Sequence, residues 1–138
     1  MSKSYRLVDR IDESGLLLCK FYGVLNMPAL RPLLEDLQEI EVKHPQGFDR
    51  FTDLAEIEEV ALQTKDIRRV SEMRQHAYRG PAVRSAIYAV QPYMFGLARM
   101  YGSMMHPSPI EVNVYYSLLE SAEFLGQKPE LLLIDPPK

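Results

Sequence analysis

The fold is decided by the stretch from Arg84 to Gly126, which reads RSAIYAV-QPYMFGLARMYGSMM-HPSP-IEVNVYY-SLLESAEFLG. Residues 84–90 are a short apolar segment of strand length, and residues 110–116 are expected to form a second strand. Pro92 and Ser117 each open a segment with apolar residues at helical spacing, over 92–105 and 117–125. Strand, helix, strand and helix in this order predict an α/β domain with parallel strands.

The rest of the chain extends this alternation toward the N-terminus. Two strands are expected over 5–12 and 16–25, joined by a tight turn at 13–15 that Gly15 permits. A helix is expected from about Ala29, capped by Asn26, and it ends before the Pro and Gly of 44–47. A strand over 48–54, an acidic loop over 55–63 and a helix over 64–79 capped by Thr64 complete the order β-β-α-β-α-β-α-β-α. The tail has a strand-like centre over 130–135.

Length and composition fit one domain over 1–138, with a core of about 5–126 and a C-terminal tail over 127–138. No apolar run approaches the ~20 residues of a membrane helix, and residues 1–6 lack the apolar segment of a secretory signal, so we expect a cytoplasmic protein. Cys19 is the single cysteine and lies in an apolar strand, where we expect an inert buried thiol.

Charge is segregated along the chain although the net charge is only −3. Residues 35–59 hold nine acidic against two basic residues, and residues 65–84 hold six basic against two acidic ones. The basic side chains of the 64–79 helix either form a solvated face or dock an acidic partner, such as the 35–59 segment of a second subunit. Nucleic acid is not expected to bind, because no aromatic residues are interleaved with the bases.

Four patterns along the chain resemble the SpoIIAA-like proteins, a branch of the STAS family (sulfate transporter and anti-sigma factor antagonist domains). They are Asp53-Leu54 with the later Thr64-Lys-Asp-Ile67, Ser85–Val90, Phe95-Gly-Leu-Ala-Arg-Met-Tyr101, and Glu111–Tyr115 followed by Leu118–Gly126. The resemblance covers about residues 5–126. It implies a mixed sheet with helices packed mainly on one face, and no enzymatic activity.

One departure from that family concerns regulation. True anti-sigma antagonists carry a phosphorylatable serine in an Asp-Ser-Ser-Gly-type turn, whereas Glu58 and Glu59 stand where that motif would fall. Thr64 is the nearest hydroxyl and is the one candidate phosphoacceptor.

Motifs for catalysis are missing from the sequence. His44, His76 and His106 lie in separate segments without metal-ligand spacing, and no Gly-rich phosphate loop or nucleophile elbow occurs. We therefore expect no enzyme, no metal and no cofactor.

The 92–105 helix has an unusually broad apolar arc that includes four methionines. Core packing, a partner or dimer surface, and a pocket for a small apolar, lipid-like ligand beneath this helix all account for it. Some relatives of this fold class are likened to lipid-binding domains.

The sequence therefore predicts a non-enzymatic interaction or regulatory domain that forms a homodimer, with the apolar-ligand carrier as the alternative. The candidate partner-binding residues are Arg68, Arg69 and Arg79 for polar docking, and Phe95, Met100 and Met104 for apolar contact.

Overall fold

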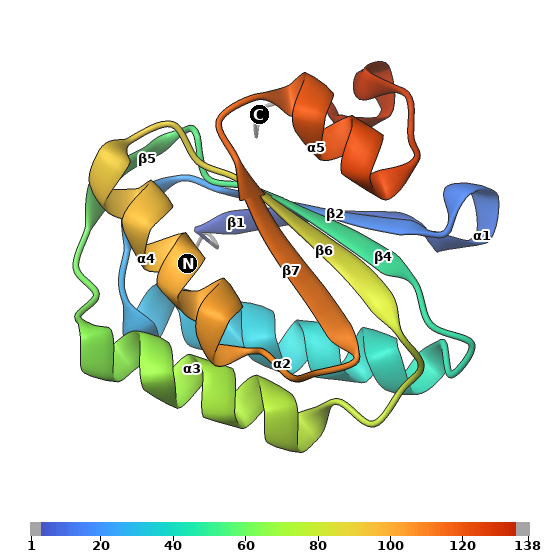
Figure 1. The fold of residues 1–138 in the computed structure, drawn as a ribbon, viewed down its shortest axis with the longest axis horizontal. Coiled ribbons are helices and arrows are strands. Elements are labelled where there is room, and N and C mark those ends of the chain that lie inside the picture. The colour runs from blue at the N-terminus through green and yellow to red at the C-terminus, as the bar shows by residue number, and fades with distance from the viewer. Residues whose placement is uncertain (1–3, 135–138) are drawn as a thin grey trace.

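A five-stranded sheet with strand order β1-β2-β4-β6-β7 forms the centre of the molecule (Figure 1). The computed structural model describes residues 4–134. The strands are β1 (Tyr5–Arg10), β2 (Leu16–Phe21), β4 (Asp49–Asp53), β6 (Val83–Tyr88) and β7 (Ile110–Tyr115). β1 runs antiparallel to β2, and the other neighbours are parallel, which confirms the predicted mixed sheet.

Three long helices cover one face of this sheet, and one shorter helix packs on the other (Figure 1). The first three are α2 (Met27–Lys43), α3 (Thr64–Ala77) and α4 (Pro92–Met104). Helix α5 (Leu118–Leu125) and the 3₁₀ helix η1 (Pro129–Leu132) lie on the opposite face. The helices are therefore mainly on one face, as the sequence predicted.

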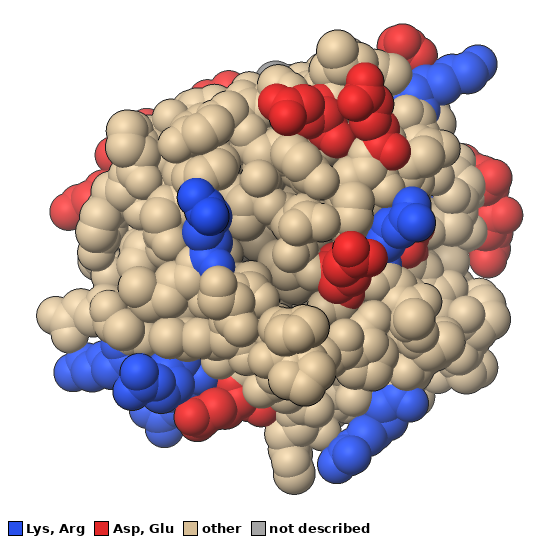
Figure 2. Space-filling model, viewed as in Figure 1, with Lys and Arg blue, Asp and Glu red and all other residues tan. Residues whose placement is uncertain are grey.

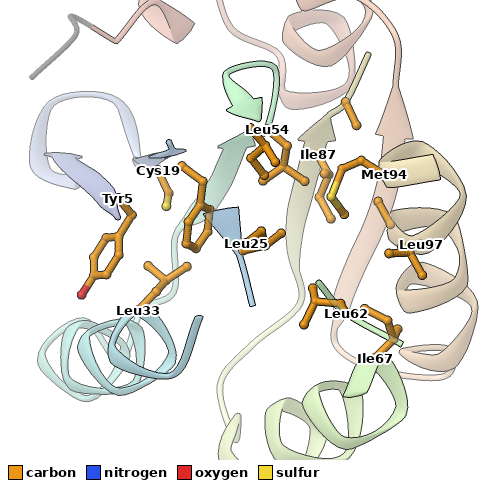
Figure 3. Close-up of a cluster of buried hydrophobic side chains, with 14 residues drawn as sticks. Tyr5, Cys19, Leu25, Leu33, Leu54, Leu62, Ile67, Ile87, Met94 and Leu97 are labelled. Atoms are coloured by element: carbon orange, nitrogen blue, oxygen red, sulfur yellow. The ribbon is translucent and has the colours of Figure 1, made fainter. Parts of the chain in front are cut away.

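Strand β2 explains how one sheet supports two cores. Leu16 and Leu18 contribute to the core under α5, while Cys19 and Phe21 face the larger core under α2, α3 and α4. Figure 3 shows side chains of the larger core converging from strands and helices. Residues Leu16–Cys19 form an uninterrupted apolar run, and both faces of the strand are buried there.

Local signals set the ends of the helices. The Asn26 side chain accepts a hydrogen bond from the Ala29 amide at 2.8 Å, so α2 begins at Met27, earlier than predicted. Pro32 lies inside α2, one turn after the bond from the Leu30 amide to the Asn26 carbonyl, and it has no amide hydrogen to donate to the Pro28 carbonyl. Ser117 caps α5 through the Glu120 amide at 3.1 Å, as predicted.

Several predicted segments differ from the structure. The predicted turn at 13–15 belongs to a one-turn helix, α1 (Ile11–Ser14), which Gly15 ends with a φ of 67°. The predicted strand 16–25 breaks after Phe21, and its end forms β3 (Gly23–Leu25). The predicted loop 55–63 contains β5 (Ile57–Val60), which pairs with β3 in a separate two-stranded sheet. Both errors have one cause, since each strand exists only through the other, distant segment.

The predicted strand-like centre of the tail is also wrong. Residues 129–132 form η1, and Asp135 lies outside the described residues. Leu132 and Ile134 are buried against the α5 side of the sheet, because the apolar run turns back onto that core.

Across residues 4–134 the helices are all too short or too polar to cross a lipid bilayer.

Candidate functional site

A cavity of about 140 Å³ lies between the sheet and the layer formed by α2, α3 and α4. Most of its wall is apolar, and the side chains come from every element around it: Phe21, Leu33, Leu54, Ile67, Ile87, Met94 and Leu97 are among them. Figure 3 shows the labelled members of this set, which are all except Phe21, converging in the larger core. The space lies beneath the 92–105 helix, where the sequence placed its apolar-ligand alternative.

The small β3–β5 sheet closes the end of the cavity at the carboxyl ends of the parallel strands. Leu25 of β3 and Leu62, just after β5, line the cavity. Two bonds tie this segment to the start of α4: Gln91 Nε2 donates to the Ile57 carbonyl at 3.0 Å, and the Tyr93 hydroxyl donates to the Leu62 carbonyl at 2.9 Å. These hydrogen bonds fix the β3–β5 segment across this end of the cavity, and none of them involves a charged group.

The other end of the cavity, at the amino ends of the strands, is charged. Arg50 at the start of β4 and Arg74 near the end of α3 line it and are 6% and 3% exposed. Glu41 of α2 accepts hydrogen bonds from Arg50 Nη1 and Arg74 Nη2, both at its Oε2 atom. We call these three residues the Arg–Glu–Arg cluster.

The Arg–Glu–Arg cluster is incompletely compensated. Two guanidinium groups share one carboxylate, while Arg50 Nε and Glu41 Oε1 have no hydrogen-bond partner among the described residues. Burial lowers the pKa of Arg50, and the opposing charge of Glu41 only partly counters that effect. A buried charge without full pairing is costly, so this end of the cavity is electrostatically strained.

Aromatic rings surround the cluster. The Arg50 guanidinium carbon lies 4.4 Å from the centre of the Phe48 ring and 5.4 Å from that of Tyr78, distances at which ring faces attract cations. Burial raises the pKa of Tyr101, although its hydrogen bond with Arg74 lowers it in part. Tyr101 therefore keeps a neutral hydroxyl beside Arg74 on the cavity wall.

A second hollow lies on the outer side of the cluster. This surface cleft of about 290 Å³ is lined by residues that include Glu41, Phe48 and Tyr78. Glu41 lines the cleft and the two arginines line the cavity, so the cluster stands between the two spaces.

The predicted polar docking residues lie on the outer face of α3 and just beyond its end. Arg68, Arg69 and Arg79 are exposed, and among residues 4–134 none of them forms an ion pair. Figure 2 shows a group of Lys and Arg side chains along the edge where α3 lies. Helical spacing in the sequence predicts a buried stripe on α3 that consists of Ile67, Val70, Met73 and Ala77. Met73 is instead 38% exposed, and Arg74 is buried, where it forms an ion pair with Glu41.

The predicted apolar contact residues are partly used inside the protein. Phe95, Met100 and Met104 are half-buried and pack against the larger core. The Phe95 ring stacks on that of Tyr116 with centres 3.7 Å apart. The broad arc of α4 thus serves the sheet and also α3, to which it is joined by the bond from Gln75 Nε2 to the Met104 carbonyl.

Thr64 is the exposed first residue of α3 rather than its cap. Gln63 is the cap, and its backbone amide donates to Asp66 Oδ2 at 2.8 Å as part of a capping box. The role of Thr64 as phosphoacceptor stays a prediction.

Metal ligands do not gather in the part of the chain that the structure describes, where no three His, Cys, Asp or Glu side chains come together. Cys19 is buried, and burial raises the pKa of its thiol, so the thiolate form is disfavoured.

Sequence reasoning missed Glu41, Arg50 and Arg74. The available signal was an ionisable residue at an apolar position of a helix stripe: Arg74 follows Ile67 and Val70 at helical spacing. That signal does not name the partner, because Glu41 and Arg74 are 33 residues apart in sequence.

Comparison with known proteins gives the fold. No family model matches the chain, and no curated protein is similar to it by sequence. A solved structure from Shewanella loihica PV-4, an uncharacterized protein of the DUF3478 family with a SpoIIAA-like fold, superimposes with a TM-score of 0.60 at 14% identity. The match covers 91% of this chain and 98% of the other. This chain therefore has a SpoIIAA-like fold, as its sequence patterns implied.

Proposed function

We propose that the protein is a binding module, not an enzyme, that holds a small apolar molecule in the cavity beneath α2, α3 and α4. One observation carries the proposal: a cavity of about 140 Å³, whose wall is mostly apolar, lies between the sheet and the three long helices. A dry apolar cavity of ~150 Å³ is large enough to bind benzene. The volume therefore favours a ligand about the size of one aromatic ring over a full-length lipid chain.

Benzene binding tests this proposal directly. Benzene should raise the urea midpoint of the wild-type protein, because it binds only the folded state. Ala98 of α4 lines the cavity, so Ala98→Val should fill part of the space, weaken benzene binding several-fold and cost less than about 1.5 kcal/mol of stability.

Ala122→Val is the matched control, since Ala122 is a buried helical alanine on the opposite face of the sheet. It should leave benzene binding unchanged. An equal response to benzene in wild type and in Ala98→Val would contradict the cavity as the binding site.

The exposed basic face of α3 supports a second function, docking of an acidic protein surface. Unpaired surface arginines attract and orient acidic partners more than they stabilise the fold. The acidic surface of this chain's own α2, which includes the exposed Glu35 and Glu39, is one such partner in a homodimer. Phe95, Met100 and Met104 would add apolar contact through the parts of their side chains that remain exposed.

A charge swap tests the homodimer. Sedimentation should show that Arg68→Glu/Arg69→Glu and Glu35→Arg/Glu39→Arg are each monomeric, because like charges then face one another across the interface. A mixture of the two variants should recover a dimer, in which one of the two interfaces has reversed but complementary charges. A wild-type protein that stays monomeric at high concentration would remove the homodimer, and Arg79→Glu extends the same test to the end of α3.

A further inference from the structure

We propose that the ligand is a small aromatic or similarly sized apolar monocarboxylate, whose body fills the cavity and whose carboxylate lies against Arg50 and Arg74. This inference rests on the proposed function, because it assigns the chemistry of the molecule that the cavity holds. It adds a head group to what volume and apolarity alone describe.

The charge of the Arg–Glu–Arg cluster is the first argument. Its two guanidinium groups and one carboxylate leave one positive charge within a buried site. Asp49, the other acid near the cluster, forms no ion pair with either arginine in the described residues, and its carboxylate accepts a hydrogen bond from the backbone amide of Arg84. A ligand with a single negative charge would bring the site to neutrality. A neutral molecule would leave the positive charge in place, and a doubly charged phosphate would give the site a net negative charge.

The position of each member is the second argument. Both arginines line the cavity, whereas Glu41 lines the outer cleft and is absent from the cavity wall. An anion that enters the cavity therefore meets the guanidinium groups first and Glu41 from behind them. The site offers a cationic end to the cavity despite the carboxylate within the cluster.

Unused hydrogen-bonding capacity is the third argument. Arg50 is 6% exposed, yet its Nε has no acceptor in the described residues. Guanidinium groups bind carboxylates through two parallel N–H donors, which are stronger than neutral hydrogen bonds. The Tyr101 hydroxyl, also on the cavity wall beside Arg74, is a further donor.

Three probes of one size separate this inference from the proposed function: benzene, benzamide and benzoate. Calorimetry on the wild-type protein at moderate salt should give a benzoate affinity at least tenfold above that of benzamide, which has the same shape and no charge. If benzene and benzamide bind and benzoate binds no tighter than benzamide, the anionic head group is wrong while the cavity site stands. If none of the three binds, the proposed function itself fails.

Two variants with opposite expected effects on the preference for benzoate test the roles of Arg50 and Glu41. Arg50→Met removes the excess charge and should abolish the preference for benzoate over benzamide. Glu41→Gln removes the competing carboxylate and should increase that preference severalfold.

Arg99→Met on the exposed side of α4 is the matched control and should leave the preference unchanged. A preference for benzoate that survives in Arg50→Met would place the anion elsewhere and overturn the assignment. Because the measured quantity is the ratio of two affinities in the same protein, a change in cavity size cancels. The wild-type comparison does not depend on whether either variant folds.

Discussion

At the scale of single residues, the members of the Arg–Glu–Arg cluster are buried to a similar extent but contribute unequally to the stability of the folded state. Glu41 is the one carboxylate that Arg50 and Arg74 share, and its side chain is 8% exposed. Removing it leaves two buried cations side by side. Removing Arg50 leaves a neutral pair of Glu41 with Arg74, in which Arg74 Nη2 and Glu41 Oε2 are 2.5 Å apart.

The predicted consequence is an unequal loss of stability. Glu41→Gln keeps hydrogen-bond acceptance but removes the charge, and should lower the free energy of unfolding by about 3 kcal/mol, the usual cost of an uncompensated buried charge. Arg50→Met should cost clearly less, even though it loses the contacts of Arg50 with the Phe48 and Tyr78 rings. Urea unfolding of both variants measures the difference, and equal losses would contradict an excess positive charge.

At the scale of helices and strands, the sequence was sufficient where one element carries its own signals. α4, α5 and β7 were placed within a residue or two, because Pro92 and Ser117 mark helix starts and apolar residues alternate with Glu111 and Asn113 along the strand. β5 was not found: Ile57-Glu-Glu-Val60 reads as acidic loop, and its strand geometry comes from pairing with β3. Local propensity cannot report a partner about 30 residues away.

The candidate site also has one part that the sequence suggested and one part that it did not. The apolar arc of α4 is broader than packing on one sheet face requires. It left three interpretations open: core packing, a partner surface and a pocket beneath the helix. The cationic end of that pocket could be predicted only in part: helical spacing places Arg74 on the apolar stripe of α3, but it does not name Glu41, the distant partner that allows Arg74 to be buried. Periodicity assigns a face, and tertiary contact decides which charged residue that face can bury.

At the scale of the whole molecule, one sheet with a core on each face spreads buried titratable groups through the structure. Tyrosines with pKa values raised above 10.0, mainly by burial, occur in both cores and at the cluster: Tyr5, Tyr78, Tyr101 and Tyr115. Burial also raises the pKa of Cys19 above 9.0. All of these groups hold their protons more firmly in the folded state than in the unfolded chain.

Stability should therefore fall at alkaline pH. Below pH 9.0 these groups are protonated in the folded and the unfolded state, so they add no pH dependence to stability. Above pH 9.0 Cys19 ionises in the unfolded chain before it does so in the folded protein, and the tyrosines do the same above pH 10.0. The unfolded state then binds fewer protons, so the free energy of unfolding decreases as pH rises. Urea midpoints measured from pH 8 to 11 should be level at first and then decline. In Tyr101→Phe the free energy of unfolding should fall less steeply with pH, by the contribution of about one titrating proton. A midpoint that stays constant to pH 11 would mean that these groups ionise as readily inside the protein as in water, and that neither core excludes solvent as the structure requires.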